Sequence, residues 1–131
     1  MDDLVRWLVE QLDEDERIAR DAGGQIQGDH HWFEVSRAKH PGVVGTQRGL
    51  LVTTDRALRE HAVHIAEHDP ARVLREIDAK RQMLALHARP HHQCVAVDGP
   101  TQWHAADPCA TLRLLALPYE DRAGYREEWR P

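Results

Sequence analysis

The sequence predicts an α+β protein in which a small antiparallel sheet of two or three strands packs with about four helices. Several segments repeat apolar residues at helical spacing, and one stretch near the N-terminal third alternates aromatic, β-branched and polar residues. The transitions between these patterns coincide with Gly or Pro. At 131 residues, the chain is expected to form a single domain around one hydrophobic core.

Residues 1–23 are predicted to form an amphipathic helix. Its apolar face consists of Leu4, Leu8 and Leu12, with Val5 and Trp7 beside them. Asp2 or Asp3 is suited to cap its start, because a carboxylate accepts hydrogen bonds from the first backbone N–H groups. The glycine pair at positions 23 and 24 is expected to end the helix.

Residues 25–54 are predicted to form the small sheet. "HWFEV" alternates in the manner of a strand, "GLLVTT" is a short apolar run, and "PGVVG" lies between them. Turns are expected near Pro41–Gly42 and within 46–49, since glycine and proline are frequent in tight turns.

Residues 55–88 are predicted to form two helices. The first runs over about 56–67 after a cap at Thr54 or Asp55. Asp69 and Pro70 then provide an N-cap and a first-turn proline for a second helix that ends near His87.

Residues 89–131 are expected to contain a loop rich in Cys and His, a helix that begins after Pro108, and a tail. The loop shows no clear period, and "CVAV" is its only candidate strand. In the tail, Tyr125 and Trp129 are apolar anchors that we expect to fold back on the body of the protein.

The composition restricts the classes of partner. The formal net charge of −5 makes nucleic-acid binding unlikely, because that function requires a basic surface. No apolar run approaches the roughly 20 residues that span a membrane. We therefore expect a soluble, cytoplasmic protein with a protein partner, and its oligomeric state is left open.

The two cysteines and nearby histidines form a candidate zinc site. Zinc favours four thiolate or imidazole ligands in a tetrahedron. The predicted set is His87, His92, Cys94 and Cys109, with His91 and His104 as alternatives. Two other interpretations stay open: the cysteines pack as small apolar residues, or Cys94 and Cys109 form a disulfide, which a reducing cytoplasm disfavours.

A second group of histidines lies in "HAVHIAEH". His61, His64 and His68 share one helix face, and the i, i+4 spacing of His64 and His68 allows metal chelation. A solvated polar helix face explains the same pattern. His64 and His68 are therefore secondary ligand candidates, including as the fourth ligand of the cysteine site.

The stretches "HIAEHDPARVLREIDAKRQMLALH" and "PCATLRLLALPYEDRAGYREEWRP" resemble a small uncharacterised family of actinobacterial proteins, described only as a domain of unknown function. The resemblance covers nearly the whole chain and is weakest over 25–50. It implies a common fold but no established activity, cofactor or partner. Some members carry Cys-x-x-Cys where this chain has "CVAV", with the second cysteine at Val97. Together with His87 and Cys109, this gives those members a set of one His and three Cys, whereas here the fourth ligand stays open.

The leading functional prediction is a small interaction or regulatory module, fastened by zinc, whose exposed tryptophans and charged faces bind a protein. The first alternative is a metal- or thiol-dependent enzyme, for which Cys109 at a helix start with His104 nearby is the best candidate. The chain carries no phosphate-binding or dinucleotide motif. The second alternative is a DNA-binding regulator, which the charge disfavours.

Overall fold

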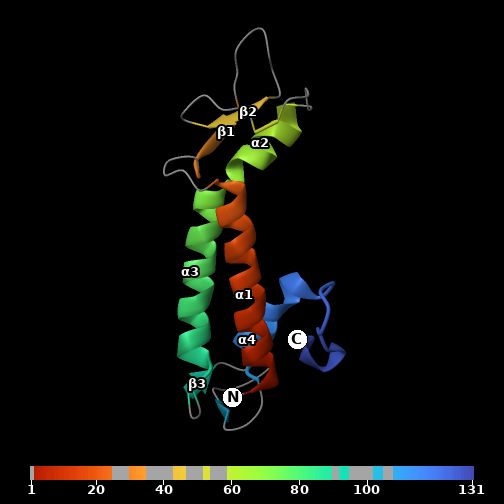
Figure 1. Ribbon diagram of the computed structural model, residues 1–131. Coiled ribbons are helices and arrows are strands. Elements are labelled where there is room, and N and C mark those ends of the chain that lie inside the picture. The colour runs from red at the N-terminus through yellow and green to blue at the C-terminus, as the bar shows by residue number, and fades with distance from the viewer. Residues whose placement is uncertain are drawn as a thin grey trace. The chain divides into compact units, whose positions relative to one another are not determined.

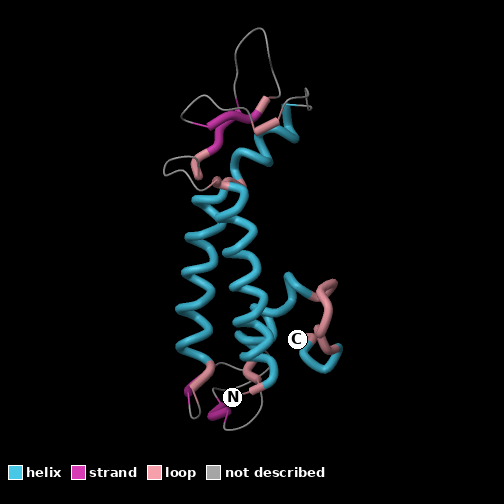
Figure 2. Tube along the Cα trace, in the orientation of Figure 1, coloured by secondary structure: helices cyan, strands magenta, loops and turns pink. Residues whose placement is uncertain are grey.

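The computed structural model describes residues 2–24, 30–34, 43–46, 52–53, 59–89, 92–94, 102–104 and 108–131. These residues contain four α-helices and two antiparallel sheets of two strands each, which confirms the predicted α+β class (Figures 1 and 2). The chain divides into two compact units. Unit 1 comprises Met1–Glu14 and Asp78–Pro131, and unit 2 comprises Asp15–Ile77. Helices α1 and α3 contribute residues to both units.

Helix α1 spans Asp3–Ala22 and begins and ends as predicted. The backbone N–H of Leu4 donates a hydrogen bond of 3.0 Å to Oδ1 of Asp2, so Asp2 is the cap. After the last turn, Gly24 adopts a φ of +70°, a left-handed conformation that glycine enters at little cost. The predicted apolar face is buried in unit 1, at Leu4, Leu8 and Leu12.

In unit 1, the last part of helix α3 (Pro70–His87) is followed by strand β3 (His92–Cys94), strand β4 (Gln102–His104) and helix α4 (Ala110–Ala116). Two 3₁₀ turns follow, η1 (Leu117–Tyr119) and η2 (Glu127–Trp129). The β3–β4 pair differs from the expected loop, and β3 lies ahead of the candidate strand "CVAV", overlapping it only at Cys94. Strands of three residues are too short to produce a readable alternation, so the sequence pattern did not reveal them.

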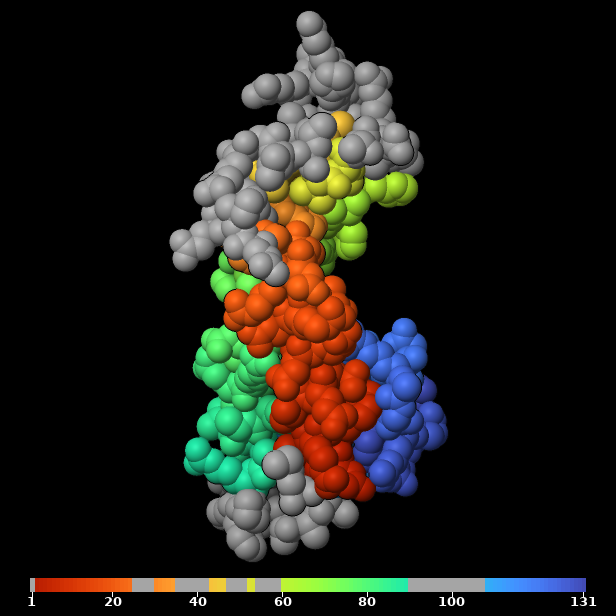
Figure 3. Space-filling model, viewed as in Figure 1, coloured from red at the N-terminus to blue at the C-terminus, as the bar shows by residue number. Residues whose placement is uncertain are grey.

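An aromatic cluster holds the C-terminal tail against α1 within unit 1, as Figure 3 shows for the blue tail beside the red helix. The Trp7 ring lies 5.3 Å from the Trp129 ring and 5.8 Å from the Tyr125 ring, measured between centroids. Tyr119 meets the Trp7 ring edge-on at 6.4 Å. The predicted anchoring of the tail by Tyr125 and Trp129 is therefore confirmed.

The aromatic cluster also corrects the expectation of exposed tryptophans for two of the four, Trp7 and Trp129. Trp7 and Trp129 are only 7% and 4% exposed, so they are core residues. The indole Nε1 of Trp7 donates a hydrogen bond of 3.0 Å to the carbonyl oxygen of Ala123. The next residue, Gly124, has a φ of +86°, and a Cβ there would lie 2.9 Å from Trp7 Nε1. Only glycine fits this tail conformation without displacement.

Charged residues of the tail add contacts around the cluster. The Arg122 guanidinium lies 4.8 Å from the centre of the Tyr119 ring, and Arg126 lies 5.1 Å from that of Trp129. Arg130 donates a hydrogen bond of 2.7 Å to Oε1 of Glu127. That hydrogen bond, with the negative charge of Glu127, raises the pKa of Arg130 above its ordinary value.

Unit 2 is built around a two-stranded sheet and helix α2 (Arg59–Glu67). Strand β1 (Trp32–Glu34) pairs antiparallel with β2 (Val44–Thr46), and Phe33 lies opposite Gly45. Val44 also accepts a hydrogen bond from the backbone N–H of Val52 and donates one to the hydroxyl of Thr53. Strands in 25–54 are thereby confirmed. The predicted turns at 41–42 and 46–49, except for Thr46, lie outside the described residues.

Asp69 joins the elements of unit 2 through its carboxylate. Oδ1 accepts a hydrogen bond of 2.8 Å from the backbone N–H of Arg72, which confirms the predicted N-cap of α3. Oδ2 accepts one of 3.2 Å from the backbone N–H of Trp32, at the start of β1. In a third hydrogen bond between the two segments, the backbone N–H of Ala71 donates to the carbonyl oxygen of His30. The helix cap therefore also anchors the sheet.

Among the described residues, no helix combines the length and apolar character needed to cross a membrane.

Candidate metal centre

Two of the four predicted zinc ligands lie side by side in unit 1. His87 is the last residue of α3, and Cys109 is the N-cap residue of α4. Their side chains meet with 3.5 Å between Nδ1 of His87 and Sγ of Cys109. Cys109 is 1% exposed, and His87 is partly buried. Residues 22 positions apart are thus brought into direct contact at the junction of two helices.

The local sequence explains this placement. Ile77 and Leu84 are buried and lie on the same face of α3 as His87, so burial of that face directs His87 inward. Leu112 and Ala116 are buried on α4, which orients the start of that helix towards the core of unit 1. Cys109 makes no side-chain hydrogen bond to the helix backbone, so its thiol does not serve as the helix cap.

The other two predicted ligands lie on the hairpin that links these helices. In β3, the backbone of His92 pairs with that of His104, and the backbone of Cys94 pairs with that of Gln102. The segment that connects α3 to α4 therefore places His92, Cys94 and His104 within one six-residue ladder. The side chains of these three residues, and all of His91, lie outside the described part of the chain. The described residues alone contain no group of three or more His, Cys, Asp or Glu able to hold a metal ion.

Sequence reasoning missed the register that pairs His92 with His104. The available signal was the Asp98–Gly99 dipeptide, which is frequent in hairpin turns and lies midway between the two strands. Both His92 and His104 were predicted as candidate ligands, but as members of an irregular loop. The register now assigns them neighbouring positions on paired strands.

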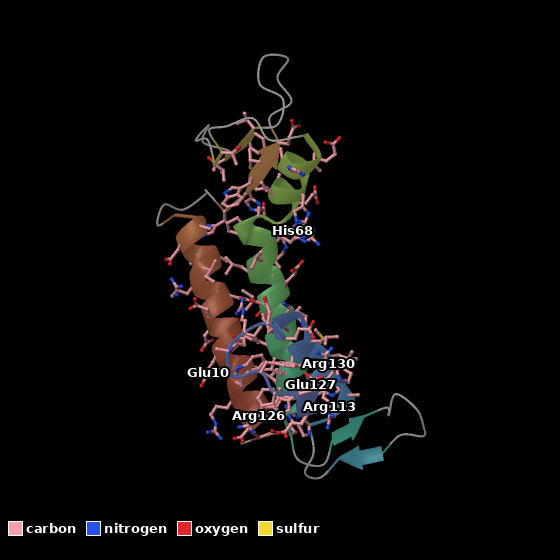
Figure 4. The ribbon with its side chains drawn as sticks, turned by 90° about the vertical axis from the view of Figure 1, so that its right-hand side faces the viewer. Glu10, His68, Arg113, Arg126, Glu127 and Arg130 are labelled. Carbon is pink, nitrogen blue, oxygen red and sulfur yellow. The ribbon has the colours of Figure 1, made fainter. Side chains whose placement is uncertain are left out.

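The secondary ligand candidates belong to unit 2. His64 lies in α2, and His68 immediately follows that helix, as Figure 4 shows for His68. Their rings are 4.3 Å apart between centroids and tilted by 40°. Nδ1 of His68 lies 2.8 Å from the backbone carbonyl oxygen of His64. Both side chains are exposed.

The geometry also bears on Cys109 as a nucleophile. Among the described side chains, the imidazole of His87 lies at its Sγ. At 1% exposure, the thiol is closed to a substrate in this conformation. The arrangement can therefore hold a metal ion or form a thiol–imidazole hydrogen bond.

The comparisons with known proteins give one match. The model of a family of unknown function, DUF6221, matches residues 1–131, so the chain belongs to this family. The searches of curated proteins and of solved structures give no significant match.

Proposed function

We propose that this protein is a small interaction module in which a structural zinc ion fastens the β3–β4 hairpin to the end of α3 and the start of α4. The proposed ligands are His87, His92, Cys94 and Cys109. His91 and His104 are the alternatives to His92. The observation that carries the proposal is the contact between His87 and Cys109.

The measured separation fits shared coordination. With Zn–S near 2.3 Å and Zn–N near 2.0–2.1 Å, tetrahedral angles place the sulfur and nitrogen of two ligands about 3.5–3.6 Å apart. Nδ1 of His87 and Sγ of Cys109 are 3.5 Å apart. A thiol–imidazole hydrogen bond has a similar length, so the distance supports the proposal without distinguishing the two states. Metal content distinguishes them.

The hairpin gives the metal a structural role. Each of its strands has three residues, and an isolated two-stranded hairpin is marginally stable in water. A zinc ion bound by ligands from the hairpin and from the two helix ends would tie the hairpin to helices α3 and α4. Because Cys109 is buried, the site resembles the closed four-ligand type rather than a catalytic site with an open position.

The interaction role follows from what the closed site leaves available. A metal with four protein ligands has no coordination position for a substrate, so the module would act through its surface. The net charge of −5 favours a protein over a nucleic acid as the partner. We place it in the cytoplasm because a reducing compartment keeps cysteines free of disulfides and available as ligands. A metal-dependent enzyme is the second candidate, and an exchangeable water on the zinc would favour it.

The test is elemental analysis of untagged protein purified without chelator. The proposal expects one zinc per chain in the wild type and loss of that zinc in His87→Ala, Cys94→Ser and Cys109→Ser. The matched control is His61→Ala, an exposed histidine of unit 2, which should keep full zinc content. Wild-type protein without stoichiometric zinc, or Cys109→Ser protein that retains it, would overturn the proposal.

A further inference from the structure

Unit 2 presents a pair of exposed imidazoles that the proposed function does not use. His64 and His68 are separated by one helical turn at the end of α2, and their rings lie against each other. We propose that these two residues form a second, open metal site that binds Cu²⁺ or Ni²⁺. This proposal is independent of the zinc site in unit 1.

The ring separation is compared with two coordination geometries, for the case in which one nitrogen of each ring turns towards a common ion. A metal bound 2.0–2.1 Å from an imidazole nitrogen lies about 3.2 Å from the ring centre. Two such rings have centres about 4.5 Å apart at a ligand–metal–ligand angle of 90°, and about 5.2 Å apart at a tetrahedral angle. The observed separation of 4.3 Å matches the 90° arrangement. Adjacent positions at 90° are typical of the tetragonal and square-planar sites of Cu²⁺ and Ni²⁺.

A backbone contact prepares His68 for metal binding. Its Nδ1 lies 2.8 Å from the carbonyl oxygen of His64, which can only accept a hydrogen bond. Nδ1 of His68 therefore donates this hydrogen bond, which leaves Nε2 as the ring nitrogen that could face a metal. Hydrogen bonds of this kind fix the tautomer and ring orientation of metal-bound histidines in general.

The surroundings favour a cation with open coordination positions. Glu60 lies one turn before His64, and Glu67 directly precedes His68. The adjacent cation, Arg72, is engaged with Glu76 at 2.8 Å and with the Glu67 backbone oxygen at 3.1 Å. It also lies 3.9 Å from the Glu67 carboxylate, so Glu60 is the carboxylate that would add negative charge beside His64. Because both imidazoles are exposed, water or a group from another molecule can occupy the remaining positions on the ion.

The test is calorimetric titration of untagged, zinc-loaded protein with Ni²⁺, a probe that does not oxidise thiols. His64→Ala and His68→Ala should each weaken Ni²⁺ binding by on the order of 100-fold, because the second ligand no longer acts intramolecularly. His61→Ala, an exposed histidine on the same helix, should bind Ni²⁺ as the wild type does. Alanine favours helix, so these variants should retain the far-ultraviolet circular dichroism of the wild type.

Each outcome decides the proposal. Selective loss in His64→Ala and His68→Ala, together with tighter binding of Ni²⁺ than of Zn²⁺, supports it. Absence of Ni²⁺ binding at millimolar concentration, or equal loss in His61→Ala, overturns it. The Cys109→Ser variant separates this site from the zinc proposal, since its Ni²⁺ affinity should be unchanged whether or not unit 1 holds zinc.

Discussion

Unit 1 and unit 2 are similar in size but are held together by different kinds of interaction. Unit 1 buries a cluster of large aromatic rings, and its tail closes over Trp7 with Tyr125 and Trp129. The buried apolar side chains that the structure describes in unit 2 include small ones such as Ala19, Val44 and Ala62. A hydrogen-bonding carboxylate, Asp69, joins its helix to its sheet. Among the described residues, the aromatic burial lies in unit 1, and a polar junction at Asp69 joins the elements of unit 2.

The same contrast separates the two candidate metal sites. The pair in unit 1 is buried and lies at the junction of two helices, as a fastening site requires. The pair in unit 2 is exposed and lies within two turns of one helix end. A metal in the first site would add to folding stability, whereas a metal in the second would bind a surface that is already formed. Four experiments test the contrast between the units.

The largest expected effect comes from truncating the aromatic cluster. Trp129→Ala removes a ring that is 4% exposed and should lower the free energy of unfolding by about 3–5 kcal/mol through lost burial and a residual cavity. Chemical denaturation measures this change. The control Leu114→Ala removes a side chain that is 53% exposed and should stay within about 0.5 kcal/mol of wild type. A cost below about 1 kcal/mol for Trp129→Ala would show that the tail is not part of the core.

Gly124→Ala tests the close approach of the tail to Trp7. A side chain at a φ of +86° is strained, and its Cβ would lie 2.9 Å from Trp7 Nε1, so we expect a loss of about 2–3 kcal/mol. Gly24→Ala has the same left-handed requirement at the end of α1 and should cost about 1–2 kcal/mol. Thermal unfolding measures the stability of both variants. Because both share the positive φ and only Gly124 approaches Trp7, the difference between their losses is the cost of the contact with Trp7. Equal losses of unfolding free energy in the two variants would show that the contact with Trp7 adds nothing to the cost of Gly124→Ala.

Asp69→Ala tests the polar junction of unit 2. The variant leaves the N–H groups of Arg72 and Trp32 without their carboxylate acceptor, which should cost about 1–2 kcal/mol. Asn is an equally good helix cap, so Asp69→Asn should lose less. Hydrogen exchange should show faster exchange in the first turn of α3 and at Trp32 in the alanine variant. Faster exchange confined to unit 1 would contradict the assignment of Asp69 to unit 2.

The smallest effect is expected at the surface ion pair of unit 1. Arg81 lies 2.7 Å from Asp13, but both side chains are exposed to solvent. A double-mutant cycle with Arg81→Gln and Asp13→Asn should give a coupling energy of at most about 1 kcal/mol, which decreases with added salt. A larger coupling energy that does not change with salt would show that this ion pair, and not aromatic burial alone, contributes substantially to the stability of unit 1.

Local signals in the sequence predicted the helix ends well, because the atoms involved are close along the chain. Asp2 caps α1 and Asp69 caps α3, each by bonding a backbone N–H two or three residues later. Burial of Leu4, Leu8 and Leu12 follows directly from helical periodicity. The tail anchors were also identified, because Tyr125 and Trp129 are the apolar side chains of an otherwise charged segment.

Features that depend on distant partners were predicted less well. Trp7 was placed beside the apolar face of the first helix, but its contacts with Ala123 and Trp129, over 110 positions later, could not be read from the local pattern. The pairing of His92 with His104 depends on a hairpin whose strands are too short to show alternation. The contact of His87 with Cys109 was anticipated from ligand chemistry, and helix packing brings the two residues together.

The most direct test of the central claim is zinc K-edge X-ray absorption on the untagged wild-type protein. The proposed site predicts two sulfur scatterers near 2.3 Å and two imidazole nitrogens near 2.0–2.1 Å, with no bound water. It also predicts a loss of one sulfur in any residual zinc of the Cys109→Ser variant. A spectrum of nitrogen and oxygen scatterers alone, or protein without zinc, would contradict the claim that His87 and Cys109 share a structural metal ion.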